Sequence, residues 1–415
     1  MGLHRFKPLP SGRMGTLWTL APVRDAAIVE FGCMGHMMYS GVTLENTGVR
    51  RGAKRYSTHI DETDIALGGT DKLAATIAHV VAQDHPRVIF LLPSSIPQVI
   101  GTDLFAEARV LQKEYPDTLL LPFGQGGFDA AQHRGVEEAL LRLVQALARE
   151  GEKTRRPTFN LIGSCADLFR FQADAAELLR IMEGAFGMKP LCILTSDTSV
   201  ADIEGMGGAH LNLVIRREGE PAAKYLQERF GTPYLLERPY GFQGTARWVE
   251  TIAQALGITP DQEFVDRQRD EGGTLLRDIT LTLRHLVRDH TEEIRLSVGA
   301  HADVARGILD FGCGELGLPK GACWCDSPHM AADDIPYFTE DQWAQAVQMH
   351  QKGLLMASGE ALRWGGKSPA LQIANPDTKR RLNPYVPPFM GFRGALHLLD
   401  LWINAVLEQE EDGDH

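Results

Sequence analysis

The chain alternates short apolar runs with longer amphipathic stretches along most of its length, and this alternation restricts the folds open to it. The apolar run 26–31 is followed by a helical pattern at 70–83, and the run 87–92 is followed by a helical pattern at 103–114. Parallel strands require crossover connections of about this length, and the crossover helices then cover both faces of the sheet. The pattern therefore predicts an α/β protein built from parallel sheets that helices cover.

The same alternation continues in two further blocks, and the charged stretch 151–157 separates the first block from the second. At 415 residues the chain is too long for one ordinary core and suits two or three domains. We expect three Rossmann-like domains: an N-terminal α/β domain at 1–156, a second at 157–260, and a third at 261–415 with a C-terminal helix. The later strands are expected at 158–163, 190–195, 210–215, 233–236, 293–298 and 353–357. The later helices are expected at 173–186, 221–230, 244–256, 261–289, 303–315 and 394–411.

The composition indicates a soluble globular protein. The chain is 44% hydrophobic and 23% charged, with a formal net charge of -12, whereas nucleic-acid binding favours a basic face. No apolar run approaches the length that spans a bilayer, and no signal-peptide core follows the basic N-terminus. We therefore expect a cytoplasmic protein that binds neither nucleic acid nor membrane.

One cysteine stands in a glycine bracket directly after the first predicted strand, in the sequence Gly32-Cys33-Met34-Gly35-His36. Glycine on both sides lets backbone approach closely and leaves the sulfur uncovered. A thiolate at the end of a buried strand can serve as a metal or cluster ligand, and a buried structural cysteine is the alternative. His36 is a candidate ligand or proton relay, with a hydrogen-bonded structural histidine as the favoured alternative.

The other cysteines stand at 165, 192, 313, 323 and 325. Their number and spacing do not indicate a secreted disulfide scaffold. Cys323-Trp324-Cys325 forms a close pair, and with Cys313 it would make a three-thiolate site, although packing without redox chemistry is favoured. Cys192 lies within an apolar strand and is expected in the core. His59 lies among acidic residues, where helix capping by Asp61 or Thr63 is favoured over proton shuttling.

Ligands of doubly wound sheets bind outside the carboxyl ends of the strands. Cys33, the pair Ser94-Ser95 and the run 163–165 all come just after a predicted strand. The phosphate-binding patterns GxGxxG after the first strand and GxxxxGK[ST] are both missing. A nucleotide hydrolase or a nicotinamide dehydrogenase is correspondingly disfavoured.

Several short motifs, taken in order, resemble the nitrogenase component 1 family, which includes cofactor-assembly scaffolds and tetrapyrrole reductases. The resemblance covers nearly the whole chain and rests on the order of its motifs. They are Gly32-Cys33, a serine/threonine, acidic, Gly-Gly pattern at 57–69, the loop 94–104, the segments 211–214, 230–234 and 240–245, and the closing glycine motif at 390–395. The resemblance implies the three-domain parallel α/β fold of that family.

The resemblance also implies site residues, with clear departures. Family subunits supply three cysteines to an iron–sulfur cluster at a subunit interface; Cys33 matches the middle one, no cysteine stands near 20–22 for the first, and Ser95 aligns with the third. We expect Cys33 as the metal ligand and Ser95 as an assisting cofactor-binding residue, with a packed loop serine as the alternative. By this resemblance, the cysteine that holds a substrate cofactor would stand at the position of Ala223. The family's cofactor histidine would stand before the closing motif, where the segment 383–388 contains no histidine.

These departures indicate a β-like subunit of a nitrogenase-like reductase. The implied partners are an α-like subunit of the same family in a hetero-oligomer and an ATP-dependent iron–sulfur reductase protein. Electrons would pass from that reductase through the shared iron–sulfur cluster to a catalytic site on the partner, and no residue of this chain is assigned a catalytic role. The alternatives are an iron–sulfur cofactor-assembly scaffold and a metal-free module that binds small ligands.

Overall fold

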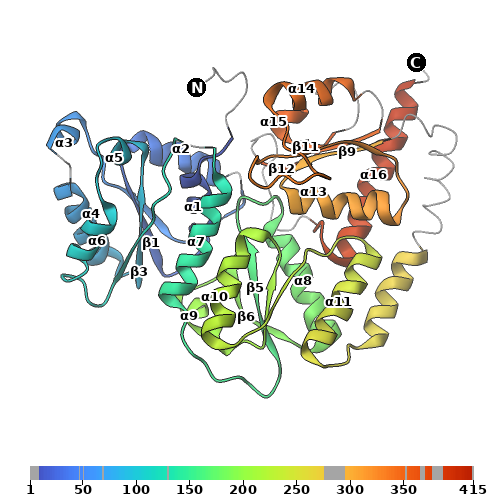
Figure 1. Ribbon diagram of the computed structural model, residues 1–415, viewed down its shortest axis with the longest axis horizontal. Coiled ribbons are helices and arrows are strands. Elements are labelled where there is room, and N and C mark those ends of the chain that lie inside the picture. The colour runs from blue at the N-terminus through green and yellow to red at the C-terminus, as the bar shows by residue number, and fades with distance from the viewer. Residues whose placement is uncertain are drawn as a thin grey trace. The chain divides into compact units, whose positions relative to one another are not determined.

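The computed structural model describes residues 9–45, 47–49, 51–67, 70–128, 130–274, 295–350, 353–364, 370–375 and 387–413. It contains three four-stranded sheets, ordered β2-β1-β3-β4, β6-β5-β7-β8 and β10-β9-β11-β12 (Figure 1). The strand pairs with a defined register run parallel. The predicted α/β class with helix-covered parallel sheets is therefore confirmed.

The chain forms two compact units. One unit contains residues 9–167 and 190–236, and with them nearly all of the first and second sheets. The other contains residues 168–189 and 237–415, and with them the third sheet. The three ranges 1–156, 157–260 and 261–415 stay a prediction of domain boundaries.

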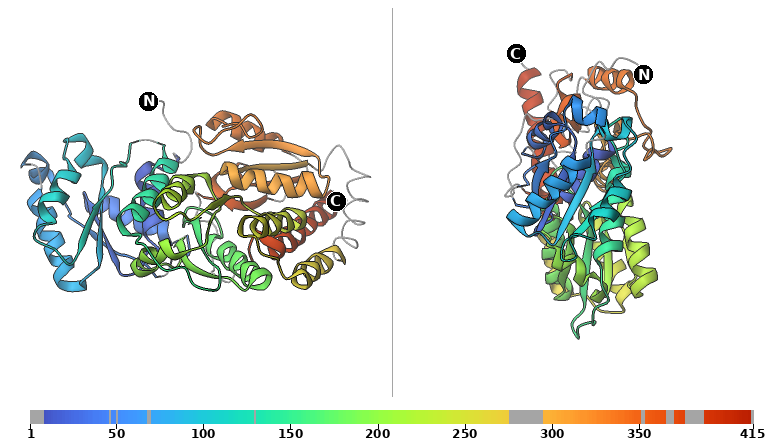
Figure 2. Two further views of the ribbon diagram at one scale, coloured as in Figure 1. Left: turned by 60° about the horizontal axis from the view of Figure 1, so that its bottom comes forward. Right: turned by 90° about the vertical axis from the view of Figure 1, so that its left-hand side faces the viewer.

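The first sheet has an apolar interior because both faces of its central strands are covered. Ala27, Val29 and Phe31 point to one face, where Leu73, Ile77 and Val80 of α4 pack with residues of α6. Helices α1 and α7 lie on the opposite side of the sheet (Figure 2). The bounds are β1 Ala26–Phe31, β2 Lys54–Ser57, β3 Val88–Pro93 and β4 Leu119–Pro122, with α1 Gly12–Leu20, α2 Met34–Glu45, α3 Glu62–Leu67, α4 Thr70–Asp84, α5 Ser95–Val99, α6 Leu104–Leu111 and α7 Gln132–Leu147.

The second sheet repeats the strand–helix alternation. Its strands are β5 Thr158–Ser164, β6 Lys189–Thr195, β7 Leu211–Val214 and β8 Tyr234–Leu236. Helices α9 Val200–Glu204 and α10 Glu220–Phe230 and the 3₁₀ turns Gly205–Gly208 and Arg217–Gly219 belong to the same unit. Every residue of β5 and β7 is buried, as expected for central strands of a parallel sheet.

The other unit contains the third sheet and several helices. The strands are β9 Arg295–Ala300, β10 Lys320–Cys325, β11 Gly353–Ser358 and β12 Ala370–Ala374. The helices are α8 Phe171–Phe186, α11 Phe242–Leu256, α13 Ala302–Leu309, α14 Glu340–Met349, α15 Gly359–Leu362 and α16 Gly391–Gly413, with a π-helical turn at Asp310–Glu315. Residues 262–274 are also helical, and the rest of the predicted helix 261–289 lies outside the described residues.

None of the helices in the described part of the chain combines the length and the apolar character that crossing a bilayer requires.

A single glutamate caps the N-terminus of α11. Gly241, which precedes this helix, has no side chain that could accept the first N–H groups. Glu315, in the π-helical turn, instead accepts from the backbone N–H of Phe242 at 2.9 Å, of Gln243 at 3.1 Å and of Gly244 at 2.8 Å. Helix N-termini leave such donors unsatisfied and favour a negative charge.

We predict that Glu315→Ala lowers the free energy of unfolding by about 1–2 kcal/mol, because three N–H groups lose a charged acceptor. Chemical denaturation measures the loss, and Glu250→Ala, an exposed glutamate within α11, is the control expected to stay within about 0.5 kcal/mol of the natural chain. Equal stability of the two variants would contradict the capping role.

Candidate functional site

The first sheet brings Cys33 and Ser95 to the same edge. Strand β1 pairs with β3 in a register that sets Phe31 opposite Pro93, and each of the two candidate residues stands two positions beyond that pair. The N–H of Ser94 donates to the carbonyl of Phe31 at 2.9 Å, so the pairing continues into the loops. Both residues therefore lie at the carboxyl end of this sheet, where ligands of parallel sheets bind.

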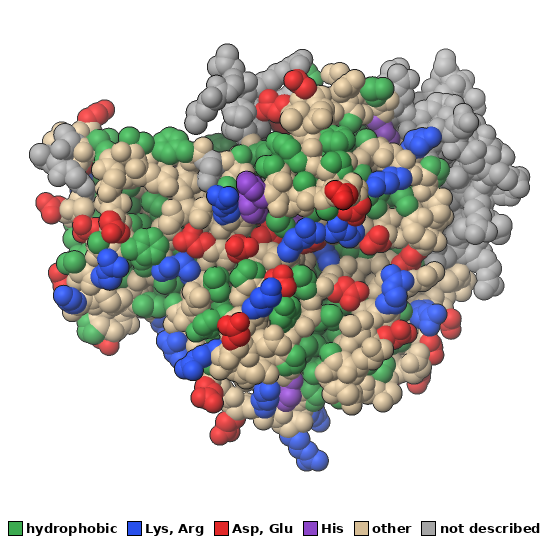
Figure 3. Space-filling view, in the orientation of Figure 1, with side chains coloured by type: hydrophobic (Ala, Val, Ile, Leu, Met, Phe, Trp, Pro, Cys, Tyr) green, Lys and Arg blue, Asp and Glu red, His purple; other side chains and the backbone are tan. Residues whose placement is uncertain are grey.

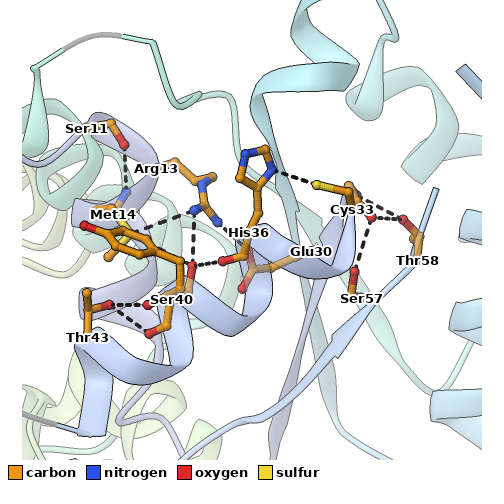
Figure 4. A network of polar contacts seen from close by, with 12 residues as sticks. Ser11, Arg13, Met14, Glu30, Cys33, His36, Ser40, Thr43, Ser57 and Thr58 are labelled. Atoms are coloured by element: carbon orange, nitrogen blue, oxygen red, sulfur yellow. Dashed lines mark hydrogen bonds and ion pairs between the residues drawn. The ribbon is translucent and has the colours of Figure 1, made fainter. Parts of the chain in front are cut away.

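Backbone contacts hold the loop that carries Cys33. The N–H of Gly32 donates to Thr58 Oγ1 at 3.0 Å, and the hydroxyls of Ser57 and Thr58 each donate to the Gly32 carbonyl at 3.2 Å (Figure 4). A Cβ on Gly32 would lie 2.2 Å from Ser94 Oγ, so only glycine allows this close approach. The end of β2 thus fixes the position from which the cysteine side chain starts.

Cys33 faces a histidine across the start of α2. Its Sγ lies 3.6 Å from His36 Nδ1, and both side chains are partly exposed (Figure 4). Burial lowers the pKa of His36, and the Arg13 guanidinium lowers it further. The neutral imidazole, which has a free nitrogen lone pair, is therefore favoured at neutral pH.

A buried ion pair lies beneath this loop. Arg13 of α1 contacts Glu30 of β1 and donates to Ser40 Oγ at 3.1 Å, and Ser40 donates to the His36 carbonyl at 2.7 Å (Figure 4). Burial raises the pKa of Glu30, although Arg13 and Arg55 act in the opposite direction. This network connects α1, β1 and α2, and it fixes the base of the helix that carries His36.

The two serines after β3 differ in their surroundings. Ser94 is fully buried, and its hydroxyl has no hydrogen-bond partner among the described residues. Ser95 is partly exposed, and its hydroxyl faces Gly127, where a Cβ would lie 2.3 Å away. The Ser94 hydroxyl is therefore an uncommon buried group without a partner in the described ranges, whereas the space at Gly127 is taken up by Ser95 itself.

The residues present fit part of an iron–sulfur site. Cys33 offers one thiolate, Ser95 one hydroxyl oxygen and His36 one imidazole nitrogen, whereas such clusters are usually held by four thiolates or substitutes. This edge therefore suits a shared cluster with further ligands from a second chain.

Exposed apolar side chains occur on three segments that follow strands of the first sheet. Met34, Met38, Tyr39 and Val42 of α2 are exposed, and Val99 of α5 and Phe128 after β4 are exposed at the ends of the neighbouring strands. These six residues are called here the apolar edge surface. Hydrophobic side chains are visible over α2 and α5 (Figure 3). Exposed apolar patches of this kind mark interaction sites.

The remaining cysteines are poor candidates for accessible thiolates. Burial raises the pKa of Cys165 and of Cys192 to about 12 and that of Cys323 to about 11. Cys192 is in the core, as predicted. Cys323 and Cys325 lie on β10, which was not expected as a strand. Within the described ranges, the thiols of Cys313, Cys323 and Cys325 do not gather closely enough for one metal ion.

The corresponding edge of the second sheet is filled by buried charges. Arg216, after β7, binds Asp167 at 2.7 Å and Glu218 at 2.9 and 3.0 Å, and all three side chains are almost fully buried. The segment Ser164-Cys165 therefore adjoins a structural ion network.

Asp61 accepts from the N–H groups of Thr63 and Asp64, which confirms the helix capping predicted beside His59.

Comparisons with known proteins bear on the whole chain. Residues 11–407 match the family described as "Nitrogenase component 1 type Oxidoreductase". "Nitrogenase iron-molybdenum cofactor biosynthesis protein NifE" of Rippkaea orientalis is 30% identical over 63% of this chain and 56% of the relative. A subunit of the light-independent protochlorophyllide reductase of Nostoc punctiforme is 31% identical over 50% of this chain and 43% of the relative.

The chain thus spans about half the length of these curated relatives. A solved structure described as "Nitrogenase Cp1 at pH 6.5" superposes with a TM-score of 0.81 and 15% sequence identity, covering 99% of this chain and 95% of the other. At this identity, the likeness concerns the fold.

The buried pair beneath the cysteine loop gives a pH-dependent prediction. Arg13→Met should lower the free energy of unfolding by about 3 kcal/mol at neutral pH, because Glu30 is left buried without its partner. Since the folded-state pKa of Glu30 is raised, the penalty should grow as the pH rises above its ordinary value of 4.5.

Denaturant titrations at about pH 5 and about pH 8 measure this difference. The double variant Arg13→Met with Glu30→Gln is the control, and its stability should change much less between these pH values. An equal loss for Arg13→Met at both pH values would contradict the account.

Proposed function

Because the chain belongs to the nitrogenase component 1 type oxidoreductases, we propose that it is the β-like subunit of a nitrogenase-like reductase. In this role it holds part of an interface iron–sulfur cluster and contributes to relaying electrons toward a catalytic site on a partner subunit. The observation that carries the proposal is the place of Cys33, partly exposed on a rigid glycine loop at the carboxyl edge of the first sheet.

The protein's own contribution is to position the ligands and exclude water. Thr58 and Ser57 hold the Gly32 backbone, and Cys33 and Ser95 each follow one of the paired strands β1 and β3. When bound, an iron–sulfur cluster supplies one-electron chemistry at a potential set by burial and by hydrogen bonds to its sulfurs. Cys33 would hold it as the thiolate ligand, and Ser95 would assist from the start of α5, after the neighbouring strand β3.

A partner subunit is required for two reasons. This chain offers too few ligands for a complete cluster, so others must come from a second chain. The apolar edge surface beside Cys33 also remains exposed, and burying it against a partner would exclude water from the cluster. An α-like chain of the same family is the partner that meets both requirements.

The substrate site is assigned to that partner. The position at which the family resemblance expects a cofactor cysteine is Ala223, a fully buried residue of α10 whose methyl group cannot bind metal. The stretch 383–388, where the family resemblance expects a cofactor histidine, lies mostly outside the described residues. Electrons would enter from an ATP-dependent iron–sulfur reductase protein.

Cofactor assembly is the second candidate function. The relatives include the cofactor biosynthesis protein NifE from Rippkaea orientalis at 30% identity and from Clostridium pasteurianum at 28%. A site with few thiolate ligands also suits a scaffold, because a scaffold must release the cofactor that it binds. An ATP-dependent change in the cluster's spectrum after mixing with the reductase protein supports relay; transfer of iron to an acceptor without such a change supports the scaffold.

Replacing the cysteine tests the proposal directly. We predict that Cys33→Ala removes iron and the cluster's electron paramagnetic resonance signal from the complex. The thermal unfolding temperature of the chain should stay that of the natural protein. Ser95→Ala should have a smaller effect. The measurement uses the native complex, isolated anaerobically through a tag on this chain, with iron and sulfide analysis.

Cys313→Ala is the matched control, since Cys313 is also a partly exposed cysteine, and it should keep full iron content. Unchanged iron and spectrum in Cys33→Ala would overturn the ligand assignment. A native complex without iron would instead favour a metal-free binding module.

Partner binding has its own test on the apolar edge surface. Val42→Asp should weaken association with the partner at least tenfold, about 1.4 kcal/mol, because a carboxylate would be buried without a counter-charge. Val110→Asp on α6 is the control, since Val42 and Val110 are 58% and 59% exposed. Co-purification and sedimentation measure association, and equal behaviour of the two variants would contradict this interface.

A further inference from the structure

We propose that His36 is a second protein ligand of the metal centre, so that this chain contributes a thiolate–imidazole pair with Cys33. The inference rests on the proposed function, because it requires metal at Cys33. It goes further by assigning a nitrogen donor where the sequence favoured a structural histidine.

The separation of the two donor atoms carries the argument. Cys33 Sγ and His36 Nδ1 are 3.6 Å apart. A tetrahedral metal such as Zn²⁺ binds sulfur at about 2.3 Å and imidazole nitrogen at about 2.0–2.1 Å, which sets the two ligands about 3.6 Å apart. The pair therefore has the spacing of two ligands on one metal ion without any side-chain movement.

The local backbone keeps the two side chains on the same side. Cys33 immediately precedes α2, and His36 lies in its first turn. The N–H of His36 donates to the Cys33 carbonyl at 3.2 Å, so the two residues, three positions apart, lie on the same face. The sulfur and the imidazole ring point toward one another (Figure 4). Ser40 anchors the next turn by donating to the His36 carbonyl at 2.7 Å.

Within the described part of the chain, one buried polar group next to the Cys33 loop lacks a hydrogen-bond partner. The fully buried Ser94 hydroxyl, which has no partner among the described residues, faces the Gly32 backbone just before Cys33. This orphaned hydroxyl is an observation, independent of the spacing of the two donor atoms, that favours a bound group here.

Mixed sulfur and nitrogen ligation has a chemical consequence. Imidazole is neutral where thiolate is negative, so replacing thiolate by histidine makes a cluster easier to reduce. A thiolate–imidazole pair would therefore raise the reduction potential relative to an all-thiolate site. His36→Cys should lower that potential while keeping the metal.

The rival explanation is that His36 only donates a hydrogen bond to the Cys33 sulfur. His36→Asn separates the two roles, because asparagine restores an N–H donor near the Nδ1 position but is a poor ligand for iron. We expect His36→Ala and His36→Asn to lose most of their iron and His36→Cys to retain it. Iron retention by His36→Asn equal to the natural chain would overturn the inference.

A direct measurement needs no variant. The native complex is isolated anaerobically from cells supplied with ¹⁵N-histidine or with unlabelled histidine, and pulsed electron paramagnetic resonance is recorded on the paramagnetic state of the cluster. Ligation predicts a strongly coupled histidine nitrogen that changes with the label and is missing in His36→Cys. If the iron content depends on Cys33 but no histidine coupling is observed, the inference is overturned and the proposed function stands. If the complex contains no iron, both are overturned.

Discussion

The parallel pairing of β1 with β3 is the constraint on which the site depends. Its register sets Phe31 opposite Pro93 and so brings the loops after both strands to one edge. A shift of one residue would turn the alternate side chains of β1, including Val29 and Phe31, away from α4 and α6. Since that shift would expose apolar surface, the hydrophobic core enforces the alignment that the candidate ligands need.

The carboxyl edges of the first and second sheets, which belong to the same unit, differ in what covers them. At the second sheet, Arg216 fills the edge by binding Asp167 and Glu218, so the buried charges there satisfy each other. At the first sheet, the buried charge pair of Arg13 and Glu30 lies below the loop and leaves the edge itself uncovered. The edge that remains open is the one that carries a partly exposed thiol and the apolar edge surface.

Much of the fold could be predicted because buried elements leave periodic patterns. The strand 26–31 matches β1, and the helix predicted at 70–83 ends one residue before α4 does. Helix α2 was missed because most of its apolar residues, among them Met38 and Val42, face solvent, so they produce no buried stripe. Strand β10 was missed because it begins with lysine and glycine and has few β-branched or aromatic residues.

The candidate site could be predicted only in part. Position after a strand identified Cys33, and family resemblance added Ser95, but the contact between Arg13 and Glu30 joins residues too far apart in sequence to foresee. The closing glycine motif also has a physical role that no sequence pattern stated. Asp174 accepts from the N–H groups of Phe389 and Met390, so it anchors the chain just before α16 begins.

The central claim is that the Cys33 sulfur binds iron at an interface between two chains. The most direct measurement is a crystal structure of the anaerobically isolated native complex, with diffraction data recorded on both sides of the iron absorption edge. The account predicts an anomalous iron peak within bonding distance of Cys33 Sγ, with the apolar edge surface covered by the partner. A Cys33 thiol surrounded by hydrocarbon, with no iron peak beside it, would contradict the account.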